Sequence, residues 1–280
     1  WIKRGSRLLR EELVRQTVNG RNWEPTTAYH RFVTEACLVH YSFSSQHPWS
    51  EGEEASDFRN TLQELVTSLV HITDVSGRIP LVGDDDGGSV LPLSAGFQVR
   101  DVRGLLHFAG ELGFDIEKEH EGQRIWEDLG MGVIWDRENF VHIVSGSPTG
   151  LARQASHRHL DMLSVVASIN GNDVILDCGT GIYFGNDEFR NWFRSEKAHS
   201  GVFSSDFSWG NIRGPFEITK PAKGMIKLAN SGITAEYIGS KGRRSRREVK
   251  IEGGKIVIRD KIELDNPVVN FVFPFGTDLK

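Results

Sequence analysis

The chain has 280 residues, of which 33 are basic and 38 acidic, so its formal net charge is −5. Apolar residues make up 38% and charged residues 25%, which is typical of a globular protein and excludes a disordered one. The acidic balance argues against a nucleic-acid partner and leaves room only for a local basic groove. No apolar run reaches the roughly 18 residues of a membrane span. The two cysteines, Cys37 and Cys178, give neither a disulfide framework nor a zinc-ribbon spacing.

The first 113 residues or so have a mainly helical pattern, because apolar residues recur three and four positions apart. Thr26 or Thr27, directly after Pro25, is a suitable N-cap for one helix, and Gly113 ends another. The triplet Asp84–Asp86 could bind a hard cation, but it lacks the alternation of a calcium-binding loop, so we interpret it as a turn. The predicted helices cover about residues 2–16, 26–38, 54–72 and 102–112.

After about Gln123 the apolar runs become short and β-branched, and Gly, Asn and Asp residues bound them, which favours β-strands. Asn170–Asp173 separates two such runs and indicates a hairpin turn. Helices first and strands after argue for an α-helical domain followed by an antiparallel β domain. The predicted strands cover residues 132–135, 141–144, 163–169, 174–176, 233–238, 248–251, 255–258 and 268–273.

The most informative polar segment is Ser156–Asp161, in which histidines occupy alternate positions. In an extended segment His157, His159 and Asp161 point to the same side, just before an apolar strand. Such a pattern suits a metal site, or a catalytic base with a metal neighbour. The competing interpretation is a pair of exposed loop histidines, which an isolated His-x-His pattern also fits.

Three other segments could carry chemistry. Tyr29 lies near a helix start beside His30 and Arg31, so a depressed pKa could let it transfer protons; the alternative is an amphipathic surface tyrosine. The polar and aromatic stretch 189–199 is interpreted as a loop that contacts anions at best. The basic run Arg243–Arg247 is interpreted as the solvated edge of a strand.

Four segments resemble motifs of the heparinase II/III family, in the same order between residues 24 and 199. Each motif alone is unspecific, but the four together are specific, so the chain is identified as a member of that family. Departures such as Arg158 between the histidines leave the proton-transfer residues in place. The matching segments are Glu24–Val33 with EQSTxYHRFV, Val82–Leu93 with GDDDxGxxLPL, His157–Tyr183 with HxHxDxLS, NG and DxGTxxY, and Arg190–His199 with RNYFRSTxAHN.

The resemblance implies an incomplete α/α toroid followed by an antiparallel β-sandwich, an α+β multidomain fold. Residues 1–124 would form the end of the toroid domain and residues 125–280 the sandwich domain. Four helices are too few for a whole toroid, and Trp1 opens the chain inside a helical pattern with no leader before it. We therefore expect a segment of a longer protein.

The resemblance also implies a polysaccharide lyase that cleaves a uronic-acid-containing polymer, such as a glycosaminoglycan or alginate, by β-elimination. Tyr29 and His157 match the family's two proton-transfer residues. A free tyrosine has a pKa of about 10, so Tyr29 must either have a depressed pKa to act as the base or stay protonated as the acid, with His157 as the base. The residue that neutralises the substrate carboxylate lies upstream of the tyrosine in relatives, so this segment alone should be a poor catalyst.

Some relatives hold a structural zinc through residues that match His159, Asp177 and His199. The resemblance therefore implies one structural zinc or other divalent metal at these positions. A simple hairpin at residues 170–173 would place Asp177 opposite Val166, on the order of 23 Å from His159 in an extended strand. For the site to form, the strand must bend or the strands must pair differently.

An acidic polysaccharide requires a local cationic groove, because a net charge of −5 opposes a polyanion. Guanidinium groups hold a carboxylate or sulfate through two hydrogen bonds. Arg158 should point away from its flanking histidines, which makes Arg31 and Arg194 the preferred residues. The candidates in or beside the motifs are His30, Arg31, Arg153, Arg158 and Arg194.

Two other function classes compete with the lyase. One is a non-catalytic carbohydrate-binding or polysaccharide-assembly protein that keeps the fold, which the presence of Tyr29 and both histidines disfavours. The other is a glycoside hydrolase, but no catalytic pair of carboxylates stands out. Relatives that degrade polymers are usually exported, so the resemblance implies a periplasmic or secreted protein. Oligomeric state cannot be read from the sequence.

Overall fold

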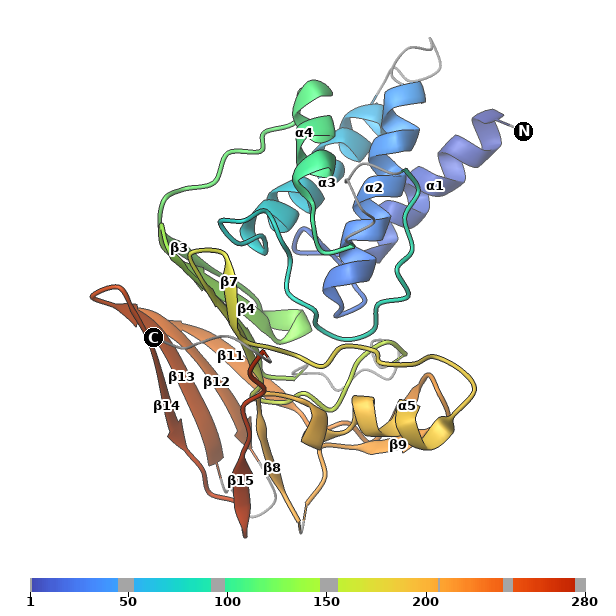
Figure 1. Ribbon diagram of the computed structural model, residues 1–280. Coiled ribbons are helices and arrows are strands. Elements are labelled where there is room, and N and C mark those ends of the chain that lie inside the picture. The colour runs from blue at the N-terminus through green and yellow to red at the C-terminus, as the bar shows by residue number, and fades with distance from the viewer. Residues whose placement is uncertain are drawn as a thin grey trace.

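The computed structural model describes residues 2–44, 53–91, 99–146, 156–205, 207–238 and 244–274. The first four helices lie at one end of the molecule and the two large β-sheets at the other, with the short fifth helix on the side of the strands (Figure 1), which confirms the predicted α+β class. None of the helices within these ranges is both long and apolar enough to cross a membrane. The helices are α1 (Ile2–Gln16), α2 (Thr27–Ser44), α3 (Glu53–His71), α4 (Arg103–Glu111) and α5 (Asp187–Arg194).

The four helices that apolar spacing predicts all occur, whereas α5 replaces part of a predicted loop. Thr26 is the N-cap of α2, because its Oγ1 accepts a hydrogen bond from the backbone N–H of Tyr29 at 3.0 Å. Helix α5 has its own cap, since the Asn186 side chain accepts from the backbone N–H of Phe189 at 3.0 Å. Its acidic first turn and Arg194 in its last turn complement the helix dipole.

The five-stranded sheet is antiparallel throughout, in the order β3-β4-β5-β6-β7. The predicted hairpin joins its last two strands. Asn170 and Gly171 have φ angles of 51° and 70°, the left-handed pair that a two-residue hairpin turn requires. The strands are β3 (Gly122–Trp126), β4 (Met131–Trp135), β5 (Asn139–Val144), β6 (Val165–Ile169) and β7 (Asn172–Ile175). The predicted domain division at residue 124 falls within β3 and stays a prediction.

A second antiparallel sheet of four strands packs against the first and completes the sandwich. Its strands are β11 (Gly224–Ala229), β12 (Gly232–Ile238), β13 (Arg244–Glu252) and β14 (Lys255–Lys261). Strands β3 and β11 were not predicted, and the predicted strand 268–273 is strand only in β15. The short antiparallel pairs are β1 (Thr17–Val18) with β2 (Arg21–Asn22), β8 (Val202–Ser204) with β15 (Pro267–Val269), and β9 (Asn211–Arg213) with β10 (Glu217–Thr219).

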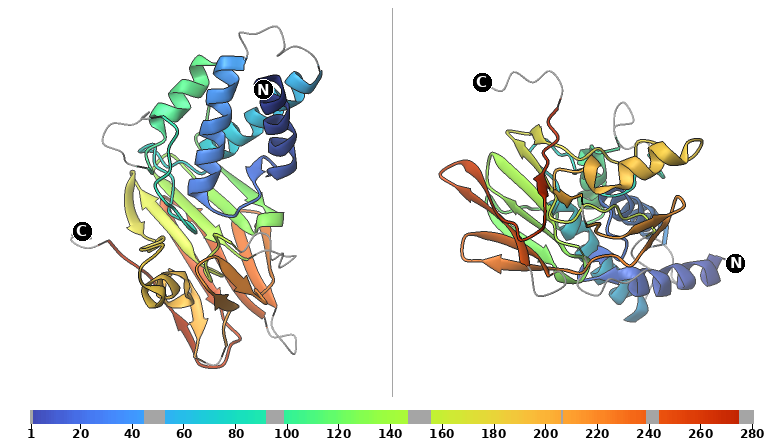
Figure 2. Two further views of the ribbon diagram at one scale, coloured as in Figure 1. Left: turned by 90° about the vertical axis from the view of Figure 1, so that its right-hand side faces the viewer. Right: turned by 90° about the horizontal axis from the view of Figure 1, so that it is seen from below.

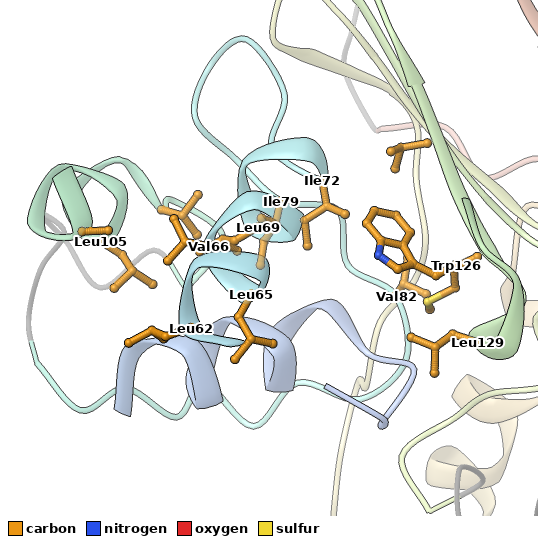
Figure 3. Packing of buried hydrophobic residues seen from close by; sticks show 14 of the residues in the cluster. Leu62, Leu65, Val66, Leu69, Ile72, Ile79, Val82, Leu105, Trp126 and Leu129 are labelled. Atoms are coloured by element: carbon orange, nitrogen blue, oxygen red, sulfur yellow. The ribbon is translucent and has the colours of Figure 1, made fainter. Parts of the chain in front are cut away.

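The central strands β4, β5 and β6 of the five-stranded sheet are buried on both faces. Val133 and Trp135 of β4 pack in the cluster formed with the helices, whereas Ile134 between them packs in the cluster formed with the second sheet. Leucines of α3 lie on the helical side with Trp126 of β3 (Figure 3). A strand buried on both faces needs apolar residues at consecutive positions, which explains the unbroken apolar runs of the sequence.

Arg247 is not part of a solvated strand edge, so that interpretation of the basic run is wrong for this residue, whereas Arg244 and Arg246 of the same run are exposed as expected. Arg247 lies in β13, a central strand, and its guanidinium is fully buried. It pairs with both oxygens of Asp260 at 2.7 and 2.8 Å and donates to the carbonyls of Leu163 and Ser200. Arg247 therefore ties the second sheet to the segments around β6. Arg243 lies outside the described residues.

The segment that follows β7 runs past the lower end of the helices and leads into α5 (Figures 1 and 2). It brings residues 177–194 next to the loop that joins α3 to α4. The backbone N–H of Asp85 in that loop donates to Thr180 Oγ1 at 2.6 Å. The backbone N–H of Asp84 donates to the carbonyl of His157 at 2.9 Å. Three parts of the chain thus meet where the sequence motifs lie.

Candidate active site

Asp84 is the centre of the site, where the sequence predicted only a turn. Its side chain has no exposed surface. Its carboxylate contacts His157 Nδ1 at 3.2 Å and His159 Nε2 at 2.8 Å, and it accepts two hydrogen bonds from Arg190 at 2.5 and 2.6 Å. The segment 156–164 is not an extended strand, but both histidines still reach the same carboxylate. The signal for Asp84 was its place in the GDDDxG motif.

The charge of Asp84 fixes the tautomers of both histidines. Burial alone would raise its pKa, but hydrogen bonds from His157, His159 and Arg190 hold the pKa far below its usual range. An ionised carboxylate can only accept hydrogen bonds, so the ring nitrogens that face it must donate. When neutral, His157 therefore carries its lone pair on Nε2, and His159 carries its lone pair on Nδ1.

Tyr29 lies beside His157, with 4.5 Å between the ring centroids. Its hydroxyl is 3.0 Å from the hydroxyl of Tyr183. Burial, together with the carboxylates of Asp86 and Asp84, raises the pKa of Tyr29, although the hydrogen bond with Tyr183 opposes that shift. The interpretation of Tyr29 as a base with a depressed pKa is therefore not supported. The alternative is favoured, in which Tyr29 stays a phenol and His157 offers the basic nitrogen.

His159, Asp177 and His199 meet in a buried cluster, in which one ligand atom of each lies within 4.8 Å of the others. The separation of about 23 Å that a simple hairpin in an extended strand would give does not occur, because the chain bends and the strand pairing shifts, as was expected to be necessary for the site to form. Leu163 has a φ of 59°, which turns the chain before β6. The pairing of β6 with β7 also shifts register at Ala167/Ser168, and β7 ends before Asp177.

The cluster fits a divalent metal. Two imidazoles and one carboxylate are a common zinc donor set. His159 Nδ1 and His199 Nε2 are buried and have no hydrogen-bond partner within the described ranges, as expected of nitrogens that face a metal ion. The other nitrogen of the His159 ring contacts Asp84, a carboxylate outside the cluster, whereas His199 Nδ1 lies 2.7 Å from Asp177, which belongs to the cluster. An outer carboxylate such as Asp84 orients a metal-binding histidine.

The family model for the heparinase II/III-like C-terminal domain matches residues 124–276, more than half of the chain. This chain is a member of the heparinase II/III-like family. A search of the curated proteins finds no match.

Solved structures of heparinase-type lyases share the fold of this family member. A heparinase III gene product and another heparinase III structure each align with a TM-score of 0.70, over 98% of this chain, at 16% and 14% identity. Heparan sulfate lyase HepC from Pedobacter heparinus aligns with a TM-score of 0.62, over 92% of this chain, at 17% identity. The chain spans 44%, 45% and 41% of these three structures, less than half of each. At such low identity the likeness shows the fold.

The residues predicted to bind substrate are not brought to an open groove in this family member. His30, Arg31, Arg158 and Arg194 are all buried. Arg31 pairs with Glu35 at 2.8 Å, and the other three contact the backbone of the protein itself. Arg153 lies outside the described residues. Charged side chains were expected to be exposed to a substrate. Instead, their hydrogen bonds to the protein backbone hold the loops around the site in place.

The metal cluster makes a prediction about stability. Replacing His159 by alanine should lower the free energy of unfolding by about 3 kcal/mol more than replacing His157 by alanine does. The reason is that a metal whose free concentration is well above its dissociation constant stabilises the folded state by that amount. Both variants lose one hydrogen bond to Asp84, but the His159 side chain is fully buried whereas that of His157 is 21% exposed, so the chelator comparison separates the metal from lost packing. Thermal melts with and without a chelator, together with elemental analysis, provide the measurement. Wild-type protein with no bound divalent metal, and melts that a chelator does not shift, would contradict it.

Proposed function

We propose that this chain is part of a polysaccharide lyase that cleaves a uronic-acid-containing polymer by β-elimination. The observation that carries the proposal is the contact of Tyr29 with His157, whose Nδ1 is held by the ionised Asp84. Membership of a heparinase-like family supports the same reaction class. The names of the aligned structures make a sulfated glycosaminoglycan such as heparan sulfate the first polymer to test.

The proposed reaction needs one base and one acid. The hydrogen at C5 of a uronic acid is acidic because the carbon bears a carboxylate. His157 Nε2 takes this proton, the electron pair of the C5–H bond forms the C4=C5 double bond, and the C4–O4 bond breaks. The Tyr29 phenol gives its proton to the departing O4. The neighbouring Tyr183 hydroxyl, at 3.0 Å, orients the phenol and offers a route by which a proton from solvent restores it.

His159, Asp177 and His199 are proposed to hold a structural divalent metal such as zinc. When bound, the metal would link the histidine segment to the end of β7 and so contribute stability rather than a reacting group. Asp84 contacts both the metal-cluster residue His159 and the proposed base His157. The same carboxylate therefore positions the base relative to the cluster. We also propose a periplasmic or extracellular location, where large polymers are accessible.

The test is an elimination assay. Full-length protein that contains this chain should convert heparan sulfate or another uronate polymer into products that absorb as conjugated unsaturated uronates. The matched control is the same polymer after its carboxylates have been reduced to hydroxymethyl groups, which removes the acidity of the C5 hydrogen. This control polymer should resist cleavage. Products with only saturated ends, or equal cleavage of the reduced polymer, would show that the reaction is not elimination.

A further inference from the structure

Two phenylalanine rings continue the site from His157 to the protein surface. The ring of Phe216 lies 5.5 Å from that of His157, and the ring of Phe184 lies 6.0 Å from that of Phe216, centroid to centroid. Phe184 is 69% exposed. Both rings also contact Tyr183, the hydrogen-bond partner of Tyr29. We refer to Phe184 and Phe216 together as the aromatic surface.

The buried guanidinium of Arg190 packs against the rings of Tyr183 and Phe216 and is held in a fixed position. The guanidinium of Arg190 lies 4.8 Å from the ring centroid of Tyr183 and 5.8 Å from that of Phe216. Its two hydrogen bonds to Asp84 and one to the carbonyl of Pro215 hold it in place. Phe216 itself follows Pro215 in the turn between β9 and β10. The rings are therefore positioned by the same carboxylate that positions His157.

The described part of the site has little exposed positive charge with which to attract a polyanion. Arg190 is buried and paired. The predicted substrate-binding residues that the structure describes are also buried, namely His30, Arg31, Arg158 and Arg194. Asp86 is exposed, and its carboxylate acts on both Tyr29 and Tyr183. Contacts that do not depend on charge are needed to hold a sugar there. The face of an aromatic ring carries partial negative charge and attracts the C–H groups on the apolar face of a pyranose.

We propose that Phe184 and Phe216 form a stacking surface for a pyranose ring of the polymer, next to the ring whose C5–H bond is broken. This inference rests on the proposed lyase function for its ligand class. It assigns the aromatic surface a contribution to binding and none to proton transfer. The contribution of the aromatic surface to affinity should not depend on salt, because salt screens ion pairs but not stacking.

The experiment compares Phe184→Ala with Phe43→Ala in full-length protein. Phe43 is a matched control, since it is 71% exposed and lies on α2 roughly 21 Å along the helix from Tyr29. Calorimetric titration with a uronate oligosaccharide is carried out in a Tyr29→Phe background, so that binding is measured without turnover. Phe184→Ala should raise the dissociation constant about 10-fold, Phe184→Trp should retain affinity, and Phe43→Ala should change nothing. The 10-fold ratio should be the same at low and high salt.

Three outcomes would overturn the inference. The first is that Phe184→Ala binds the oligosaccharide as tightly as the Tyr29→Phe protein in which it was made. The second is that this Tyr29→Phe protein does not bind a uronate oligosaccharide. The third is a change of oligomeric state in Phe184→Ala with unchanged sugar affinity, since the surface would then contact a second copy of the chain. If binding depends on Phe184 but the wild-type protein forms no unsaturated product, the aromatic surface stands and the proposed elimination fails. If the unsaturated product forms normally but Phe184→Ala leaves the affinity for the oligosaccharide unchanged, the proposed elimination stands and the inference about the aromatic surface fails.

Discussion

Replacing Tyr29 by phenylalanine should lower the turnover number for polymer cleavage by about 10²-fold or more, the usual contribution of a positioned acid or base. The change removes one hydroxyl and its hydrogen bond with Tyr183. The ring, which packs at 4.5 Å from that of His157, is kept. We therefore expect the fold and the Michaelis constant to be nearly unchanged, because the lost interaction acts in the transition state.

The control for this variant is Tyr41→Phe on the same helix. Tyr41 is also partly buried and stacks edge-on against Phe114 at 5.1 Å, far from the motif residues along α2. Steady-state kinetics and thermal melts of both variants provide the measurement. A Tyr29→Phe enzyme that turns over at a near-normal rate would remove Tyr29 from the mechanism.

The pH profile separates the two roles that the sequence left open for Tyr29. An acid must carry its proton, and the raised pKa of Tyr29 keeps the phenol protonated beyond the ordinary value of about 10. Loss of the Tyr29 proton should therefore not lower activity up to about pH 9. A base with a depressed pKa would act only after losing its proton, and activity would then rise with pH. A rising limb present in wild type and absent in Tyr29→Phe would assign the base role to Tyr29.

The sequence predicted those parts of the fold that depend on local pattern. Apolar spacing predicted the four main helices, and the threonines after Pro25 predicted an N-cap at Thr26 or Thr27, which the structure places at Thr26. Helix α5 was not predicted, although Phe189, Trp192 and Phe193 have the spacing of one helix face. The helix has only eight residues, and Phe189 and Trp192 on that face are exposed, so a pattern over two turns did not identify it.

The site itself depends on contacts between distant parts of the chain. Asp84 pairs with His157, 73 residues away, and with Arg190, 106 residues away, so the triplet around it resembles an ordinary turn when read locally. The approach of His159 to Asp177 depends on a register shift and a positive φ, neither of which periodicity reveals. The family motifs indicated that these residues belong to the site, whereas the structure was needed to show that they are buried and which residues they contact.

Burial also explains why charge was a poor guide to substrate binding. Arginine is usually exposed unless it is paired, so Arg158 and Arg194 were expected at the surface. Both are buried, and their guanidinium groups donate to carbonyls of Leu129 and Gly214. The buried positive charges near the site therefore hold loops together, and the partly exposed side chains of Tyr29 and Phe216 contact the ring of His157.

Replacing Asp84 by asparagine should lower the free energy of unfolding by about 3–5 kcal/mol, because one partner of a buried ion pair is neutralised while the Arg190 charge stays buried. An amide has the shape of the carboxylate, but its NH₂ group would face donors on Arg190 or His159. His157 would also lose its ionised acceptor, so activity should fall by about 10²-fold or more even where the variant is folded.

Asp86→Asn is the matched control for stability, since Asp86 belongs to the same triplet but is exposed and accepts a hydrogen bond from the backbone of Gly88. Because the Asp86 carboxylate also acts on Tyr29, the reference for activity is the wild-type protein. Denaturant unfolding and kinetics of both variants are the measurements. The double variant Asp84→Asn with Arg190→Gln should regain part of the lost stability, because no unpaired charge remains buried, but it should not regain activity, because His157 is still without a carboxylate partner. An Asp84→Asn protein that is as stable as Asp86→Asn and as active as the wild type would show that Asp84 neither balances Arg190 nor positions the base.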